Sequence, residues 1–119
     1  MKAEILSIGT ELLLGSITDT NASWLAQQLP MLGVDLYYIS AVGDNRTRLV
    51  ETLQRAWQRS DLIICTGGLG PTDDDLTREA ISDLLGEPMV VVPEVAQALR
   101  DWFAARGVVM PEKNVKQAT

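Results

Sequence analysis

The sequence has no histidine and a single cysteine, Cys65, and each scarcity narrows the chemistry. Without histidine, Ser-His-Asp and Cys-His catalysis and histidine-ligated zinc sites are excluded. Any bound metal should therefore be a hard cation with oxygen ligands, Mg²⁺ or Mn²⁺, and neither zinc nor haem is expected. A lone cysteine cannot form an internal disulfide, which favours a reducing, cytoplasmic location.

Basic residues and long hydrophobic runs are also scarce. The chain has ten basic and sixteen acidic residues, which gives a net charge of −6. No basic cluster is present to neutralise phosphates along a nucleic acid, so nucleic-acid binding is not expected. The longest apolar runs, such as Leu12–Leu14 and Met89–Val92, are too short to cross a membrane. Glu4 and Glu11 interrupt the N-terminal apolar stretch, so a signal peptide is not expected either.

The acidity is concentrated in one part of the chain. Between Asp61 and Glu87 there are seven acids and one base, Arg78, so this stretch alone carries −6. The rest of the chain has nine acids and nine bases. Three consecutive aspartates, at positions 73–75, lie at the centre of the acidic stretch, and they are the first candidates for chemistry.

Hydrophobic patterning predicts three short strands, at residues 3–8, 34–42 and 62–65. The last is a continuous apolar run, typical of a strand buried on both faces. Four helices are predicted, beginning near Thr20 or Asn21, after an N-cap at Asn45, within residues 73–75, and at Pro93. The order of elements is thus β-α-β-α-β-α-α.

The ends of three of these helices are marked by glycine, at Gly33, Gly86 and Gly107. The apolar stripes of the helices should face the core. Three tryptophans fall on these stripes, so we expect core packing of Trp24, Trp57 and Trp102.

This order predicts an α/β fold: a three-layer α/β/α arrangement with a mostly parallel sheet and right-handed crossovers. Residues 1–119 should form a single domain. Three strands with four helices make a thin sheet, and the tail at 108–119 offers at most one more short strand. We therefore expect the domain to be C-terminally incomplete, lacking its last strands, and the chain to form a homo-oligomer through unpaired sheet edges.

The predicted strands all end in small or acidic residues. Gly9-Thr10-Glu11 follows the first strand, Gly43-Asp44 the second, and Thr66-Gly67-Gly68 the third. In open α/β sheets, ligands bind outside the carboxyl ends of the strands. Glu11, Asp44 and the glycine loop should therefore meet at one edge of the sheet.

The loop at residues 66–72 contains Gly67, Gly68 and Gly70 and leads towards a predicted helix. Backbone N–H groups freed of side chains suit a phosphate, and a helix N-terminus adds positive potential. A tight strand-to-helix turn explains the glycines equally well. The loop has neither the Walker A nor the dinucleotide-binding spacing.

The three aspartates follow this loop directly. A phosphate in the loop would meet like charges unless a divalent cation lay between them, which favours metal binding or general-base use of at least one aspartate. Helix capping explains one or two aspartates but not three. Taken singly, Glu11, Asp44 and Asn21 are explained as a surface acid, a turn residue and a helix cap.

Two longer motifs resemble a known family. Residues 8–15, Ile-Gly-Thr-Glu-Leu-Leu-Leu-Gly, with Thr-Asp-Thr-Asn at 18–21, look like the opening of the CinA competence/damage-inducible family. Residues 66–77, Thr-Gly-Gly-Leu-Gly-Pro-Thr-Asp-Asp-Asp-Leu-Thr, resemble its central signature. The N-terminal domain of that family belongs to the molybdopterin-binding superfamily, with MogA and MoaB. Asp74 and Asp75 match the aspartate pair of the signature.

The resemblance implies a three-layer fold whose glycine loop holds an ADP-ribose-like nucleotide or molybdopterin. It implies a metal-dependent ADP-ribose pyrophosphatase; the alternative is a molybdopterin-binding module without hydrolase activity. The catalytic residues would be Asp74, Asp75 and Glu11, with Asp74 and Asp75 also binding Mg²⁺ or Mn²⁺. The ligand-binding residues would be Thr10, Asn21, Asp44, Thr66, Gly67, Gly68, Gly70 and Thr72. The family's deamidase activity belongs to a separate domain and is not expected here.

Overall fold

A three-stranded parallel sheet lies at the centre of the molecule. In the computed structural model, which describes residues 1–119, β1 (Lys2–Ile8) lies between β2 (Asp35–Val42) and β3 (Leu62–Thr66). Both neighbours run parallel to β1. The central strand is buried on both faces: from Ala3 to Ile8 each residue is almost fully buried.

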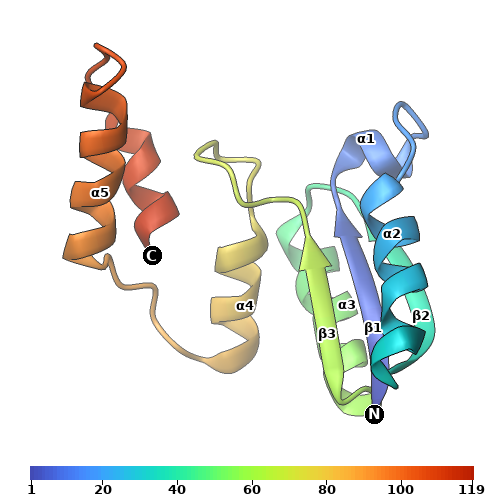
Figure 1. Cartoon of the computed structure of the whole chain (residues 1–119). Coiled ribbons are helices and arrows are strands. Elements are labelled where there is room, and N and C mark those ends of the chain that lie inside the picture. The colour runs from blue at the N-terminus through green and yellow to red at the C-terminus, as the bar shows by residue number, and fades with distance from the viewer.

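Helices cover both faces of this sheet. They are α1 (Thr10–Leu13), α2 (Thr20–Gln28), α3 (Arg46–Arg59), α4 (Thr77–Leu85) and α5 (Pro93–Ala104), with 3-10 helices η1 (Leu29–Leu32) and η2 (Glu112–Ala118). Figure 1 shows α2 on one side of the sheet and α3 on the other, with α4 beside α3. The predicted three-layer α/β/α fold with a parallel sheet is confirmed. None of the helices combines the length and the hydrophobicity that a membrane-spanning helix requires.

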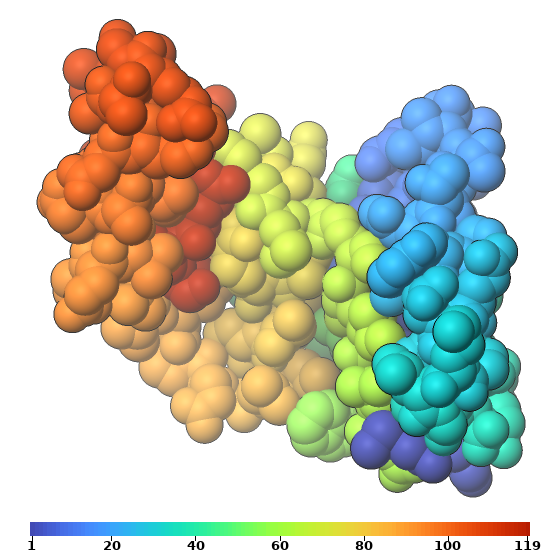
Figure 2. Space-filling model, viewed as in Figure 1, coloured from blue at the N-terminus to red at the C-terminus, as the bar shows by residue number.

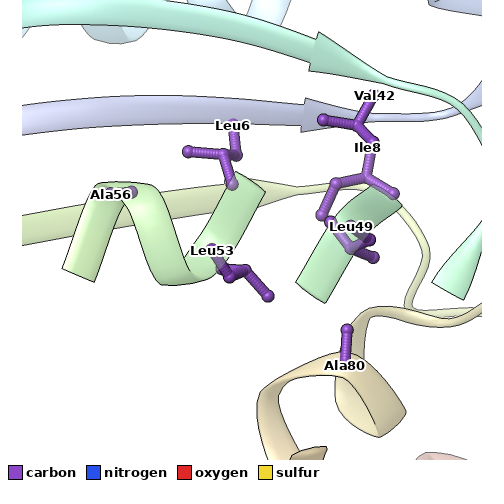
Figure 3. Close-up of a cluster of buried hydrophobic side chains, with 7 residues drawn as sticks. All are labelled: Leu6, Ile8, Val42, Leu49, Leu53, Ala56 and Ala80. Atoms are coloured by element: carbon purple, nitrogen blue, oxygen red, sulfur yellow. The ribbon is translucent and has the colours of Figure 1, made fainter. Parts of the chain in front are cut away.

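The alternation of β1 divides the core into two halves. Ala3 and Ile5 contact α2 and η1 through Ala22 and Leu29. Leu6 and Ile8 point the other way, as strand geometry requires, towards α3 and α4. Figure 3 shows this second half, made of Leu6, Ile8, Val42, Leu49, Leu53, Ala56 and Ala80.

Several predicted helix boundaries are confirmed. The side chain of Asn45 caps α3 by accepting a hydrogen bond from the Arg48 amide at 3.0 Å. Gly33 and Gly86 follow η1 and α4 in the left-handed conformation that glycine favours. Pro93 is the first residue of α5.

Other predictions about these elements are wrong. The short helix α1 was not predicted, and neither was η2 in the tail, for which at most one short strand was expected. The helix α4 begins at Thr77 and not within residues 73–75, because the carboxylate of Asp75 bonds back to Thr72 and closes a separate turn. Every residue of β3 is only half-buried, because this strand has no neighbour on its outer side.

The tryptophans were expected in the core, and all three lie at the surface. Trp24, Trp57 and Trp102 are 62%, 61% and 52% exposed. On α3, Ala56 is buried and Trp57 is rotated by about 100° from it, since a helix has 3.6 residues per turn. On α2 the buried position is Ala22, two residues from Trp24 and so on nearly the opposite side.

The C-terminal residues form a hairpin of α5 and η2 that stands apart from the sheet. In Figures 1 and 2 these orange and red elements lie beyond α4. The hairpin is closed by a hydrogen bond of 2.8 Å from the Val92 amide to the Ala118 carbonyl. Its apolar side chains, such as Val95 and Trp102, stay exposed, so its packing gives it little burial.

A buried carboxylate near the N-terminal end of β1 links the sheet to α3. Arg59 of α3 donates two hydrogen bonds to Glu4, at 2.7 and 2.9 Å, and Ser60 donates a third at 2.5 Å. The Arg59 guanidinium lies 3.5 Å from the centre of the Tyr38 ring on β2. The hydrogen bond from Arg59 is the main cause that holds the pKa of Glu4 below its ordinary value.

This lowered pKa predicts acid sensitivity. A carboxyl group whose pKa falls on folding stabilises the folded state fully at pH values above its unfolded pKa of about 4.3. This contribution is lost as the pH drops through the lower pKa of the folded state. We expect Glu4→Gln to lower the urea midpoint at pH 7, and the difference from the unmodified chain to shrink towards pH 3. Denaturation curves across this range measure it. Glu51→Gln, an exposed change on α3, is the control; an equal effect of both variants would contradict the role of Glu4.

Candidate functional site

The carboxyl ends of the three strands meet at one edge of the sheet, as predicted. The Gly9 amide, after β1, donates to the Val42 carbonyl at the end of β2 at 2.9 Å. Further along these two loops, Thr10 and Asp44 are hydrogen-bonded to each other. The Thr10 hydroxyl donates to the Asp44 carboxylate at 3.1 Å and accepts from the Asp44 amide at 3.0 Å. These two predicted ligand residues are therefore engaged with each other.

The glycine loop follows β3 and is fixed by the first turn of α4. The buried Thr77 hydroxyl donates to the Gly67 carbonyl at 2.7 Å, and the Thr77 amide donates to the Gly68 carbonyl at 3.2 Å. Gly67 and Gly68 both have positive φ, at 88° and 67°. A Cβ on Gly67 would overlap the Ile8 carbonyl oxygen, and one on Gly68 would overlap the Thr77 hydroxyl. The loop can lie this close to β1 and α4 because these positions are glycine.

Backbone amides are left free at this edge. The N–H groups of Gly67, Gly68 and Leu69 donate to no acceptor in the protein, and neither does that of Asn21 in the first turn of α2. Asp19 caps that helix by accepting from the Ala22 amide at 3.1 Å. Unsatisfied amides in a loop and at a helix start are the groups that bind anions.

A polar pocket of about 170 Å³ is lined by Gly67 of the glycine loop and by Asn21 of α2, two of the residues with free amides. Figure 2 shows the surface hollowed between the blue segment that includes α1 and the yellow-green glycine loop. Its lining has seven polar or glycine residues: Glu11, Thr18, Asp19, Thr20, Asn21, Thr66 and Gly67. Four of the predicted site residues are thus brought together here: Glu11, Asn21, Thr66 and Gly67. Thr18 and Thr20 lie in the motif at 18–21 but were not predicted to be ligands.

The second half of the glycine loop forms a separate turn outside this pocket. The Asp75 carboxylate accepts from the Thr72 hydroxyl at 2.7 Å and from the Thr72 amide at 3.0 Å. The hydroxyl bond is the main cause that lowers the pKa of Asp75, and the Gly70 amide also contributes. Asp75 therefore occupies the anion-binding side of its own turn. Gly70, Thr72 and Asp75 serve the loop, and the structure does not bring them to the pocket.

The carboxylates do not form a ready metal centre. No group of three or more acidic or cysteine side chains lies close enough to hold an ion. Asp75 is bonded to Thr72 and Asp44 to Thr10. Asp74 is exposed and has no hydrogen-bond or ion-pair partner in the chain, so of the predicted pair it is the one whose carboxylate is free.

Lys116, a basic residue that was not predicted to contribute here, contacts the same loop. Lys116 of η2 donates to the Thr72 and Asp75 carbonyls, at 2.5 and 2.6 Å, and Arg78 donates to those of Leu69 and Gly70 at 2.9–3.0 Å. No local sequence signal could have paired Lys116 with a loop more than forty residues earlier.

A parallel sheet with helices on both faces, and a glycine loop with free amides at the strand ends, is the architecture of an α/β domain that binds an anionic ligand. Residues 4–118 match the family model described as "Probable molybdopterin binding domain". The chain therefore belongs to the molybdopterin-binding domain family.

Individual relatives agree with this assignment and with the resemblance to CinA. A CinA-like protein from Thermomicrobium roseum is 53% identical over the whole chain, which spans 29% of the length of that protein. The crystal structure of CinA from Thermoplasma acidophilum matches 99% of this chain and 69% of its own, with a TM-score of 0.87 and 27% identity. MoaB from Thermus thermophilus, at 22% identity and a TM-score of 0.67 over 99% of this chain and 70% of its own, shows the same fold.

The close approach at Gly67 gives a stability prediction. Gly67→Ala combines a strained positive φ with overlap on the β1 backbone, and should cost roughly 2–5 kcal/mol in the free energy of unfolding. Gly86→Ala is the matched control: its φ is 65°, but a Cβ there meets no atom within 4 Å, so strain alone applies and the cost should be about 1–2 kcal/mol. Urea titrations measure both; equal costs would show that the contact with Ile8 is unimportant.

Proposed function

We propose that this chain binds a phosphorylated pterin, or a nucleotide of similar build, at the edge between the glycine loop and α2. The observation that carries the proposal is the set of free amides: those of Gly67 and Asn21, which line a polar pocket, and those of Gly68 and Leu69, which follow Gly67 in the loop. Membership of the molybdopterin-binding domain family supports a pterin-type ligand.

The charges around the site determine how such a ligand would lie. Three basic side chains of this region are engaged within the protein: Arg78 and Lys116 hold loop carbonyls, and Arg46 is paired with Asp83 at 2.6 Å. For a phosphate in the loop, the backbone amides of Gly67, Gly68 and Leu69 supply three neighbouring donors.

The pocket itself carries the opposite sign. Glu11 and Asp19 line it, and carboxylates accept hydrogen bonds but donate none. They would repel a phosphate and would accept the ring N–H and amino groups of a pterin. We therefore assign the ring to the pocket and the phosphate to the glycine loop. At about 170 Å³ the pocket is smaller than a typical whole-ligand site, which agrees with its holding only one part of the ligand.

Replacement of Glu11 tests the placement of the ring. Glu11→Gln should weaken the binding of neopterin phosphate roughly tenfold, because a hydrogen bond to a charged group contributes about 1.5–3 kcal/mol. Titration calorimetry measures the affinity, and Glu51→Gln on α3 is the control. Absence of saturable binding to the unmodified chain would overturn the proposal. Equal affinity of the Glu11→Gln variant would overturn the role given to Glu11.

We propose a second activity, the divalent-metal-dependent hydrolysis of the pyrophosphate bond of ADP-ribose. The observation that favours it is the free carboxylate of Asp74 beside the loop. Mg²⁺ is commonly held by one or two carboxylates together with substrate phosphates, and Asp74 fits that donor set without a larger cluster. Bound there, Mg²⁺ or Mn²⁺ would neutralise charge on the pyrophosphate. Asp75, engaged with Thr72, would keep the turn in shape, and Glu11, one of the two acidic residues that line the pocket, would act as the base.

Asp74→Asn tests this activity. Hydrolysis of ADP-ribose to AMP and ribose 5-phosphate in the presence of Mn²⁺ should fall at least about a hundredfold, the usual effect of removing an acid–base group or metal ligand from a site. Chromatography of the products measures the rate. Asp101→Asn, an exposed change on α5, is the control. Undiminished turnover in the Asp74 variant would exclude Asp74, and no turnover by the unmodified chain would exclude the activity.

A further inference from the structure

Two basic side chains hold four backbone carbonyls of the loop between β3 and α4. Arg78 donates to the carbonyls of Leu69 and Gly70, and Lys116 donates to those of Thr72 and Asp75. The ends of this loop are fixed by other means, since Thr66 belongs to β3 and Thr77 bonds to the Gly67 and Gly68 carbonyls. The middle of the loop, from Leu69 to Asp75, is held by the two cations and by the carboxylate of Asp75.

Lys116 is engaged with three acceptors inside the protein. It donates hydrogen bonds to the Thr72 carbonyl at 2.5 Å and the Asp75 carbonyl at 2.6 Å, and it forms an ion pair with the Glu79 carboxylate at 3.2 Å. Its side chain is only 20% exposed and does not line the pocket. Its effect on binding should therefore act through the shape of the loop.

Lys116 connects the C-terminal hairpin to the loop between β3 and α4. Lys116 lies on η2, in the hairpin that stands apart from the sheet in Figure 1. Its bonds cross 41 and 44 residues to reach Asp75 and Thr72. Because each peptide unit is planar and trans, a carbonyl held on the η2 side turns the next amide to the other side. The C-terminal hairpin thus orients the peptides that follow Thr72 and Asp75, in the second half of the loop.

We propose that Lys116 is a positioning residue of the ligand site, which holds the turn at 72–75 so that the free amides of the glycine loop stay in one arrangement. The proposal rests on the binding function proposed above. It adds that the C-terminal hairpin, which contributes no lining residue to the pocket, controls the affinity of that site.

The test uses Lys116→Met and Lys116→Arg, with Lys113→Met as the matched control, since Lys113 is an exposed lysine of the same helix. Amide hydrogen exchange should quicken tenfold or more at Thr72 and Asp75 in the Met variant, because both amides bond within this turn. Exchange at Leu49 and Leu53 in α3 should not change. Lys113→Met should match the unmodified chain throughout.

Two further measurements separate positioning from general stability. The pKa of Asp75, followed by carboxyl ¹³C NMR, should rise in the Met variant because the positive charge of Lys116 contributes to lowering it. Lys116→Arg should keep the pKa low and restore most of the protection, since Arg retains the charge and several donors. Affinity for neopterin phosphate should fall about tenfold in the Met variant and much less in the Arg variant.

Each outcome bears on one proposal. Unchanged exchange at Thr72 and Asp75 in the Met variant, or faster exchange throughout the chain, would overturn the role of Lys116. Local loosening of the turn with unchanged affinity would also overturn it. If the unmodified chain does not bind the probe at all, the proposed function fails, and the exchange and pKa data still decide whether Lys116 holds the turn.

Discussion

The burial of β1 between α2 and α3 is the constraint on which the rest of the structure depends. A strand buried on both faces must be covered from both sides, and so the chain crosses from one side of the sheet to the other between β1, β2 and β3. The parallel direction of the strands then brings their carboxyl ends to one edge. The loops after Ile8, Val42 and Thr66 meet there, and the close contact between Gly67 and the Ile8 carbonyl follows from this convergence.

The candidate site illustrates how an acidic chain can provide for an anionic ligand. The basic side chains of Arg78 and Lys116 donate hydrogen bonds to backbone carbonyls of the loop and do not line the pocket. The free hydrogen-bond donors of the loop are therefore backbone amides. Asp75 shows the same chemistry within the protein, because its carboxylate is bound by the amide and hydroxyl of Thr72. The segment thus contains one anion-binding turn that is filled by its own side chain and a neighbouring loop whose amides are open.

Features that depend on local sequence were predictable, and features that depend on distant contacts were not. The strands, the cap at Asn45 and the turns at Gly33 and Gly86 follow from apolar patterning and from the residues that favour such positions. The meeting of Glu11 with Thr66 and Gly67 also followed, because parallel strand ends converge, whereas Asn21 was expected there only from the family resemblance. The predicted start of α4, within residues 73–75, was wrong, because the hydrogen bond from Thr72 to Asp75 competes with helix formation. Lys116 contacts the loop because the C-terminal hairpin packs beside it. The position of this hairpin cannot be predicted from local sequence patterns.

The surface placement of all three tryptophans has a consequence for spectroscopy. Trp24, Trp57 and Trp102 are each more than half exposed, so their fluorescence already reports a polar, hydrated surrounding in the folded chain and changes little when the core comes apart. They lie on α2, α3 and α5, one on each side of the sheet and one on the hairpin. A molecule that covered any of these surfaces would remove water from one indole ring. Tryptophan emission in this protein is therefore a sensor of association more than of folding.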